Sequence, residues 1–222
     1  MPHKGEKMKK LLMGALTGVA LTFATAASAQ TVEKENSIGF EWNSFYEQPL
    51  PKELTSRWNV TRVEVIVPDR LTVSEENKFA PNADIVWHGD VRGDRKAQLA
   101  KILQAAGKRG AAKLKSGQNV HLVIQLEEFH GMTPLALRKL KYSGVYNISM
   151  VLSVHDGPTN KPIIEPIPVY ADLEAFTGAR FAQAEAEGNT QKKRVIEHVA
   201  TVIAGWLNAG PDPRRDILRR GR

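Results

Sequence analysis

The chain has 222 residues, no cysteine and a formal net charge of +7. Without cysteine it cannot form a disulfide, use a thiol nucleophile, hold an iron–sulfur cluster or carry the lipid-modified cysteine that anchors a lipoprotein. The charge is concentrated at the two ends, because residues 1–29 and 211–222 contribute +3 each and the body only about +1. We therefore expect no nucleic-acid partner.

Residues 1–29 have the three regions of a cleavable secretory signal. Two lysines precede the apolar run 11–24, which is short for a membrane span, and small residues close the segment. We expect signal peptidase to cleave between Ala29 and Gln30, and translation to start at Met8. The pattern predicts a periplasmic protein, and the absence of cysteine predicts that it is not a lipoprotein.

Residues 30–57 are polar and predict an irregular N-terminal arm. The arm contains four aromatic residues, Phe40, Trp42, Phe45 and Tyr46. We expect these rings to pack on the domain as a strap, and the alternative is a segment that binds a partner. A single α/β domain is expected over 58–210, followed by a basic, flexible tail over 211–222.

The strands are predicted from alternating apolar residues. The segments 58–67, 120–126 and 147–154 alternate apolar and polar positions, which is typical of strands with one buried face. Two shorter extended pieces are expected at 71–73 and 84–87. These segments predict a sheet with one core face and one wetter face.

Two long helices and one short helix are predicted from their caps and apolar stripes. The first long helix begins after Asp94 and ends at Gly117, and the second is capped by Asn189 or Thr190 and ends at Gly210. The short helix begins after Thr133 with a proline in its first turn. The two long helices are expected to place their apolar stripes on one face of the sheet.

The remaining segment before the last helix is less regular. Residues 163–173 are extended but contain Pro166 and Pro168, so this strand is expected at a sheet edge. Residues 178–188 are ambiguous between helix and loop. In all, the order of elements predicts an α/β sandwich in which a mixed sheet of four or five strands carries the two long helices on one face.

The densest group of polar and aromatic residues precedes the first long helix. Asp84, Trp87, His88 and Asp90 lie there, and His130 follows a strand that could end nearby. A ligand groove could use the indole as its floor and the acids as hydrogen-bond acceptors. The alternative is a loop that leads into the helix, in which Trp87 packs and the acids cap.

Catalytic motifs are absent from the sequence: there is no phosphate-binding loop, no nucleophile elbow and no paired-histidine metal motif. A metal or catalytic site would need convergence of His88, Asp90, His130, His155 and Asp156. A histidine near a loop more often bonds the backbone or a carboxylate, so we expect no metal, no cofactor and no catalytic residue.

Basic residues gather at the start of the last helix and in the tail. They are Lys192, Lys193, Arg194, Arg214, Arg215, Arg219 and Arg220. Such a run is usually a solvated face. It could also contact anionic lipid or a polyanionic envelope polymer, at about 1 kcal/mol per basic residue near the surface.

Several segments together resemble a family of exported alphaproteobacterial proteins of unknown function. They are Trp58 to Pro68, Leu71 to Glu75, Asp84 to Trp87, Phe129 to Thr133 and Thr190 to Val195. The resemblance covers most of residues 58–207 and implies an envelope protein, since many members of that family are lipoproteins. It implies no catalytic residues.

These observations favour a non-catalytic periplasmic binding or accessory protein of the cell envelope, whose partner is an envelope protein or polymer. The partner could bind at either of two surfaces. One is formed by the loops with Trp87, His88 and His130, and the other by the edge strand with Pro166 and Pro168. One alternative is a hydrolase or metal-dependent enzyme that uses the His/Asp group. A second is a structural component of an envelope assembly.

Overall fold

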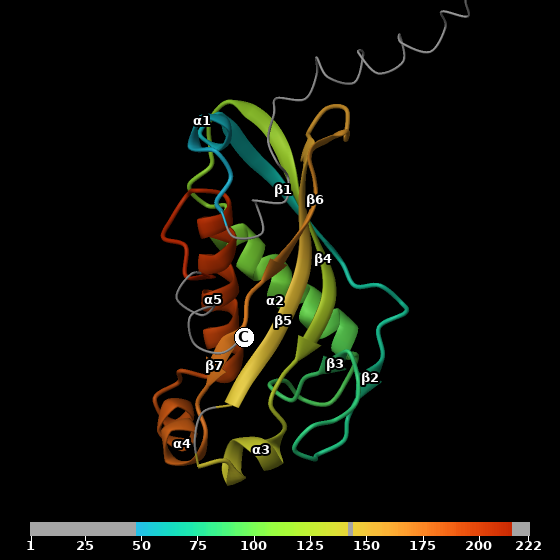
Figure 1. The fold of residues 1–222 in the computed structure, drawn as a ribbon, viewed down its shortest axis with the longest axis vertical. Coiled ribbons are helices and arrows are strands. Elements are labelled where there is room, and N and C mark those ends of the chain that lie inside the picture. Colours follow the sequence, from blue (N-terminus) through green and yellow to red (C-terminus); the bar gives the residue numbers. More distant parts are fainter. Residues whose placement is uncertain (1–47, 142–143, 215–222) are drawn as a thin grey trace, which may run out of the picture. The chain divides into compact units, whose positions relative to one another are not determined.

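Seven strands form a mixed sheet in which β4 and β5 are the two long central strands (Figure 1). A computed structural model describes residues 48–141 and 144–214. These residues belong to the unit Glu41–Arg222. The leader with its Ala29–Gln30 cleavage point, the four aromatic residues of the arm and the arginines from Arg215 onward lie outside the described residues.

The described elements follow the predicted order, with additions. The strands are β1 (Trp58–Ile66), β2 (Val73–Ser74), β3 (Ile85–Val86), β4 (Gln118–His130), β5 (Gly144–Asp156), β6 (Pro162–Tyr170) and β7 (Leu173–Ala175). The helices are α1 (Lys52–Thr55), α2 (Arg95–Gly110), α3 (Pro134–Lys139), α4 (Gly178–Ala186) and α5 (Gln191–Trp206).

The sheet is built around the antiparallel pair of β4 and β5. β1 and β3 both pair with β4 in parallel, β1 along its first half and β3 at its end, and β2 pairs with β3. β6 and β7 both pair with β5 in antiparallel. The sheet is wider than the four or five strands expected, because the short pieces β2 and β3 both pair within it and β7 adds a further strand of three residues, too short to show alternation.

The core lies between one face of the sheet and the helices α2 and α5, as the α/β sandwich prediction requires. The inward positions of β4 and β5 alternate along each strand and are fully buried, among them Leu122, Ile124, Ile148 and Met150. They join one apolar cluster with the inner stripes of both helices. The predicted helical caps are confirmed: the side chains of Asp94, Thr133 and Thr190 each accept a backbone N–H of the first turn.

The ends of the helices differ from the prediction. α2 ends at Gly110 and not at Gly117, because the chain turns back there and the carbonyl of Leu114 accepts the amide of Val60 at 3.0 Å. α5 ends at Trp206, followed by Asn208 in the left-handed region at φ 53°. The ambiguous segment contains α4. No helix among the described residues is long and apolar enough to cross a membrane.

Candidate functional site

Trp87 lies in the core, and this decides between the two interpretations of its loop. The side chain is fully buried and packs edge-on against Phe129, with ring centroids 5.5 Å apart. Its indole Nε1 donates to Asp90 Oδ2 at 2.9 Å. A fully buried indole cannot be the floor of an open groove, so the expectation of a ligand groove built on Trp87 is wrong, and the helix-entry loop is what the structure contains.

Asp90 joins this loop to the last helix. Its other carboxylate oxygen accepts from Lys192 Nζ at 2.7 Å, between residues 102 positions apart. Burial raises the pKa of Asp90, but the hydrogen bonds from Lys192 and Trp87 outweigh burial and hold the pKa below its ordinary value. Asp90 is therefore a structural acceptor with both oxygens in use.

Two other members of the predicted ligand set, Asp84 and His130, also hold loops together. Asp84 accepts the backbone N–H and the hydroxyl of Thr72, both at 2.7 Å, and these bonds lower its pKa. His130 Nε2 lies 2.8 Å from the carbonyl of Pro81. His88 Nε2 is buried without a partner in the described structure, and burial lowers its pKa.

Arg95 fixes the start of α2 against this loop. Its guanidinium is 3 % exposed and donates to both carboxylate oxygens of Glu75, at 2.6 and 3.0 Å. It also donates to the carbonyls of Asp90 and Val91 and to the side chain of Gln98. A buried arginine with this many acceptors serves the fold.

The residues of the catalytic alternative do not converge. Val86 pairs with His130 at one end of β4, whereas His155 pairs with His121 near the other end. Nine positions separate His121 from His130, which is about 30 Å at the rise of a strand. Among the described residues, no three histidines or acids lie close enough to hold a metal ion.

The basic residues of the last helix are mostly paired. Lys192 binds Asp90, and the guanidinium of Arg194 lies 3.3 Å from the ring centre of Phe176 while it donates to the carbonyl of Glu174. Arg214 is 5 % exposed and paired with Asp212, so the expectation that it contacts an anionic surface is wrong. Lys193 is the exposed member of the described set.

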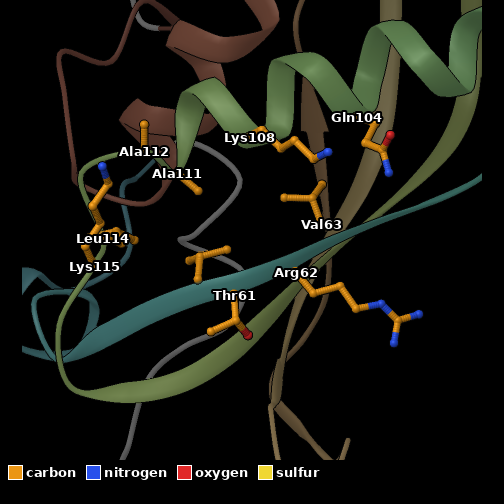
Figure 2. Close-up of a pocket in the computed structure, with 10 residues that line it drawn as sticks. Thr61, Arg62, Val63, Gln104, Lys108, Ala111, Ala112, Leu114 and Lys115 are labelled. Carbon is orange, nitrogen blue, oxygen red and sulfur yellow. The ribbon is translucent and has the colours of Figure 1, made fainter.

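A different basic surface lies between β1 and the end of α2. A cavity of about 580 Å³ opens there, and we call it the basic groove (Figure 2). Its lining residues are Val60, Thr61, Arg62, Val63, Gln104, Lys108, Ala111, Ala112, Leu114 and Lys115. Of these described residues, three are cationic and none is acidic.

The shape of the groove follows from β1. The register of β1 against β4 shifts between Val60 and Arg62, which leaves Thr61 as a bulged residue. Figure 2 shows Lys108 reaching from α2 towards Val63, while Arg62 points away from the helix. Val63 is buried, so the groove has an apolar floor below a cationic wall.

The lysines of the groove are not neutralised within the described residues. The ion pairs found there do not include Lys108 or Lys115, whereas Arg62 is paired with Glu64. A second cavity of about 490 Å³ shares Leu114 and Lys115 and has a wall of Lys52 and Lys113, again without an acid. The cationic surface therefore continues around the loop that follows α2.

The residues of the basic groove do not stand out in the sequence. Lys108 lies off the apolar stripe of α2, where a lysine is ordinarily a solvated surface residue, and Arg62 is one polar position in an alternating strand. The available signal was the pair of glycines, Gly107 and Gly110, which allow the end of α2 to lie close to its neighbours. These glycines point to the groove only once the strand that packs against α2 is known, and the sequence does not identify that strand.

Comparison with known proteins gives a family and two distant structures. The family model of unknown function DUF6778 matches residues 58–221. A crystal structure of a proposed lipoprotein from Caulobacter crescentus CB15 is 12 % identical, covers 70 % of this chain and 92 % of its own, and has a TM-score of 0.33. A Xanthomonas campestris protein of family DUF330 is 14 % identical, with 77 % and 94 % covered and a TM-score of 0.39. No curated protein matches the chain.

Proposed function

This chain belongs to the family of unknown function DUF6778, and we propose that it is a non-catalytic binding domain of the bacterial cell envelope that takes an anionic partner at the basic groove. One observation carries the proposal. The groove combines an apolar floor with Lys108 and Lys115, which have no ion-pair partner among the described residues, and none of the described residues that line it is acidic.

The charge of the groove sets the chemistry of the partner. Cations grouped in a concave surface attract anions over several ångströms and raise the rate of encounter. Complementary charges also exclude cationic partners, because like charges brought together cost free energy. An anionic partner is thus favoured both in rate and in specificity.

The cellular location is proposed from the sequence. Residues 1–29 carry the regions of a cleavable signal, and the chain has no cysteine for a lipid anchor. We place the protein in the periplasm of a Gram-negative bacterium, as a member of an alphaproteobacterial branch of its family. The partner would be an envelope protein or polymer.

The proposal is tested by titrating the purified protein with a fluorescently labelled octaglutamate peptide. The variant Lys108→Glu/Lys115→Glu reverses the two groove lysines. Its matched control is Lys139→Glu/Lys161→Glu, which makes the same change in net charge at exposed lysines elsewhere. We expect the groove variant to bind about tenfold more weakly and the control less than about twofold more weakly.

Two results would contradict the proposal. An equal loss of affinity in both variants would mean that the peptide responds to net charge and not to the groove. Unchanged affinity in the groove variant would mean that the peptide binds elsewhere. Thermal unfolding of each variant by circular dichroism confirms that both remain folded.

A further inference from the structure

We infer that the anionic partner is an acidic, extended segment of another protein, which adds as a new strand to the free edge of β1. The inference rests on the proposed function and names the class of partner. A segment bound in this way would lie in the basic groove, between the edge of β1 and the end of α2 (Figure 2). Strand addition is a general mode of peptide recognition in which the backbone supplies affinity and alternate side chains supply specificity.

Within residues 48–141 and 144–214, the outer edge of β1 is paired only at its start. β1 pairs with β4 on one side. On the other side, Asn59 forms an isolated bridge with Lys115 and the amide of Val60 donates to Leu114. From position 61 to position 66, no described residue pairs with this edge. Six residues of strand span about 20 Å, enough to pair with a short peptide.

The opposite edge of the sheet is protected. β6 carries Pro162, Pro166 and Pro168, and a proline has no N–H to donate to an added strand. β1 contains no proline over its whole length. The two edges therefore differ in their capacity to accept a strand. The edge of β1 is favoured over the edge with Pro166, which was one of the two binding surfaces predicted from the sequence.

The groove would select acidic side chains on one face of the added strand. Successive side chains of a strand point to opposite faces of the sheet. On the face that carries α2, every second side chain would meet Gln104 and Lys108. A carboxylate there can pair with Lys108 in a charge-assisted hydrogen bond. The residues between them would point to the open face, on the side of Arg62.

Backbone pairing distinguishes a peptide from the other anionic candidates. An anionic polymer or a lipid headgroup can neutralise the lysines, but it has no regular row of N–H and C=O groups to meet the edge. A second copy of this chain would bring its own β1 edge, and with it the cations Lys108 and Lys115. Like charges placed opposite each other destabilise a strand pair, so an acidic segment of a different protein fits better.

The test uses three octapeptides of equal charge. The first alternates glutamate with threonine, and the other two carry the same sequence with every second amide N-methylated, one in each register. Methylation removes the N–H donors without changing charge. We expect the unmodified peptide to slow hydrogen exchange of amides within 61–66, and at least one methylated peptide to bind tenfold more weakly or worse.

The outcomes separate the two proposals. If all three peptides bind equally and Lys108→Glu/Lys115→Glu still weakens them, strand addition is overturned and the anionic groove stands. If no peptide binds, but vesicles with anionic lipid or inorganic polyphosphate bind in a manner that depends on Lys108, the partner is not a protein strand. If the protein dimerises and the peptide does not compete, the edge belongs to a second copy and the inference is overturned. If no anionic probe responds to the groove lysines, both proposals fail.

Discussion

Gly107 of α2 lies directly against Val63 of β1: a Cβ atom on Gly107 would come within 2.7 Å of Val63 Cγ1. This contact lets the end of the helix lie close to the edge strand. It brings Lys108, the next residue of the helix, to the groove beside β1. The glycine thus sets the separation of the two walls between which the proposed partner would bind.

We expect Gly107→Ala to lower the free energy of unfolding. The added methyl would also meet Ile124 Cδ1 at 2.8 Å, and overpacking of this kind costs about 1–3 kcal/mol. Alanine regains up to about 1 kcal/mol of helix propensity. A net loss of about 1 kcal/mol should be measured in urea unfolding. Gly93→Ala has a looser surrounding, because its Cβ would lie 3.2 Å from Gln98 Nε2 and 3.8 Å from the carbonyl of Val91. It should lose less, and equal losses would contradict the close contact at Gly107.

Removing the carboxylate of Asp90 should destabilise the protein more than removing its lysine partner. Asp90→Ala leaves the buried indole N–H of Trp87 without its acceptor, which costs about 1–3 kcal/mol. Lys192→Ala removes a partly exposed ion pair, which is worth about 0–1 kcal/mol. Asp90→Asn should fall between them, because its carbonyl can still accept from the indole. Urea unfolding followed by tryptophan fluorescence measures the order, and a larger loss in Lys192→Ala would contradict it.

The guanidinium of Arg95 should not be replaceable by an ammonium group. Arg95→Lys keeps the charge but loses the two-pronged contact with Glu75, and we expect a loss of about 2 kcal/mol in the free energy of unfolding. Arg92→Lys provides the control, because Arg92 is exposed and has no ion pair among the described residues. A loss below about 0.5 kcal/mol in Arg95→Lys would show that charge alone holds the loop.

Stability should fall as the pH drops below 6.5. Burial lowers the pKa of His198 in the folded protein, against an opposing hydrogen bond with the backbone of Asp172. The unfolded state therefore binds the proton more readily, so this contribution to stability is present above 6.5 and lost as the pH falls. His88 shifts in the same direction.

Urea unfolding between pH 7.5 and pH 5.5 measures this effect. The loss from His198 is at most about 1.4 kcal/mol per pH unit below 6.5. In His198→Gln, the free energy of unfolding should depend less steeply on pH over this range. An identical dependence in the variant would assign the effect to other groups. The carboxylates with lowered pKa values act at lower pH, below about 4.5.

Regular alternation and helical caps made the central elements predictable. β4 and β5 alternate as their sequences indicate, and Asp94 and Thr190 cap the helices that follow them. These signals are local, because alternation and capping involve residues only a few positions apart in the sequence. The sequence also indicated extended pieces where β2 and β3 lie, but their pairing depends on distant segments. No local pattern indicated β7 or the early end of α2.

The candidate site was not predictable for the same reason. Trp87 and its polar neighbours form a dense group in sequence, yet the indole is buried and Asp90 is used by Trp87 and Lys192. Conversely, Lys108 and Arg62 are unremarkable in sequence and lie in one groove in the structure. The high density of polar and aromatic residues along the chain thus marked a loop that stabilises the fold and not a ligand site.

The sequence by itself determined which residues face the core, where the long helices begin and that disulfides and thiol chemistry are absent. The tertiary structure decided which charges remain unpaired. Lys192 is neutralised by a partner 102 positions away, whereas Lys108 and Lys115 face a groove whose described lining contains no acid. The burial pattern can be predicted from short-range periodicity in the sequence. Ion pairing depends instead on distances of a few ångströms between residues that are remote in the chain.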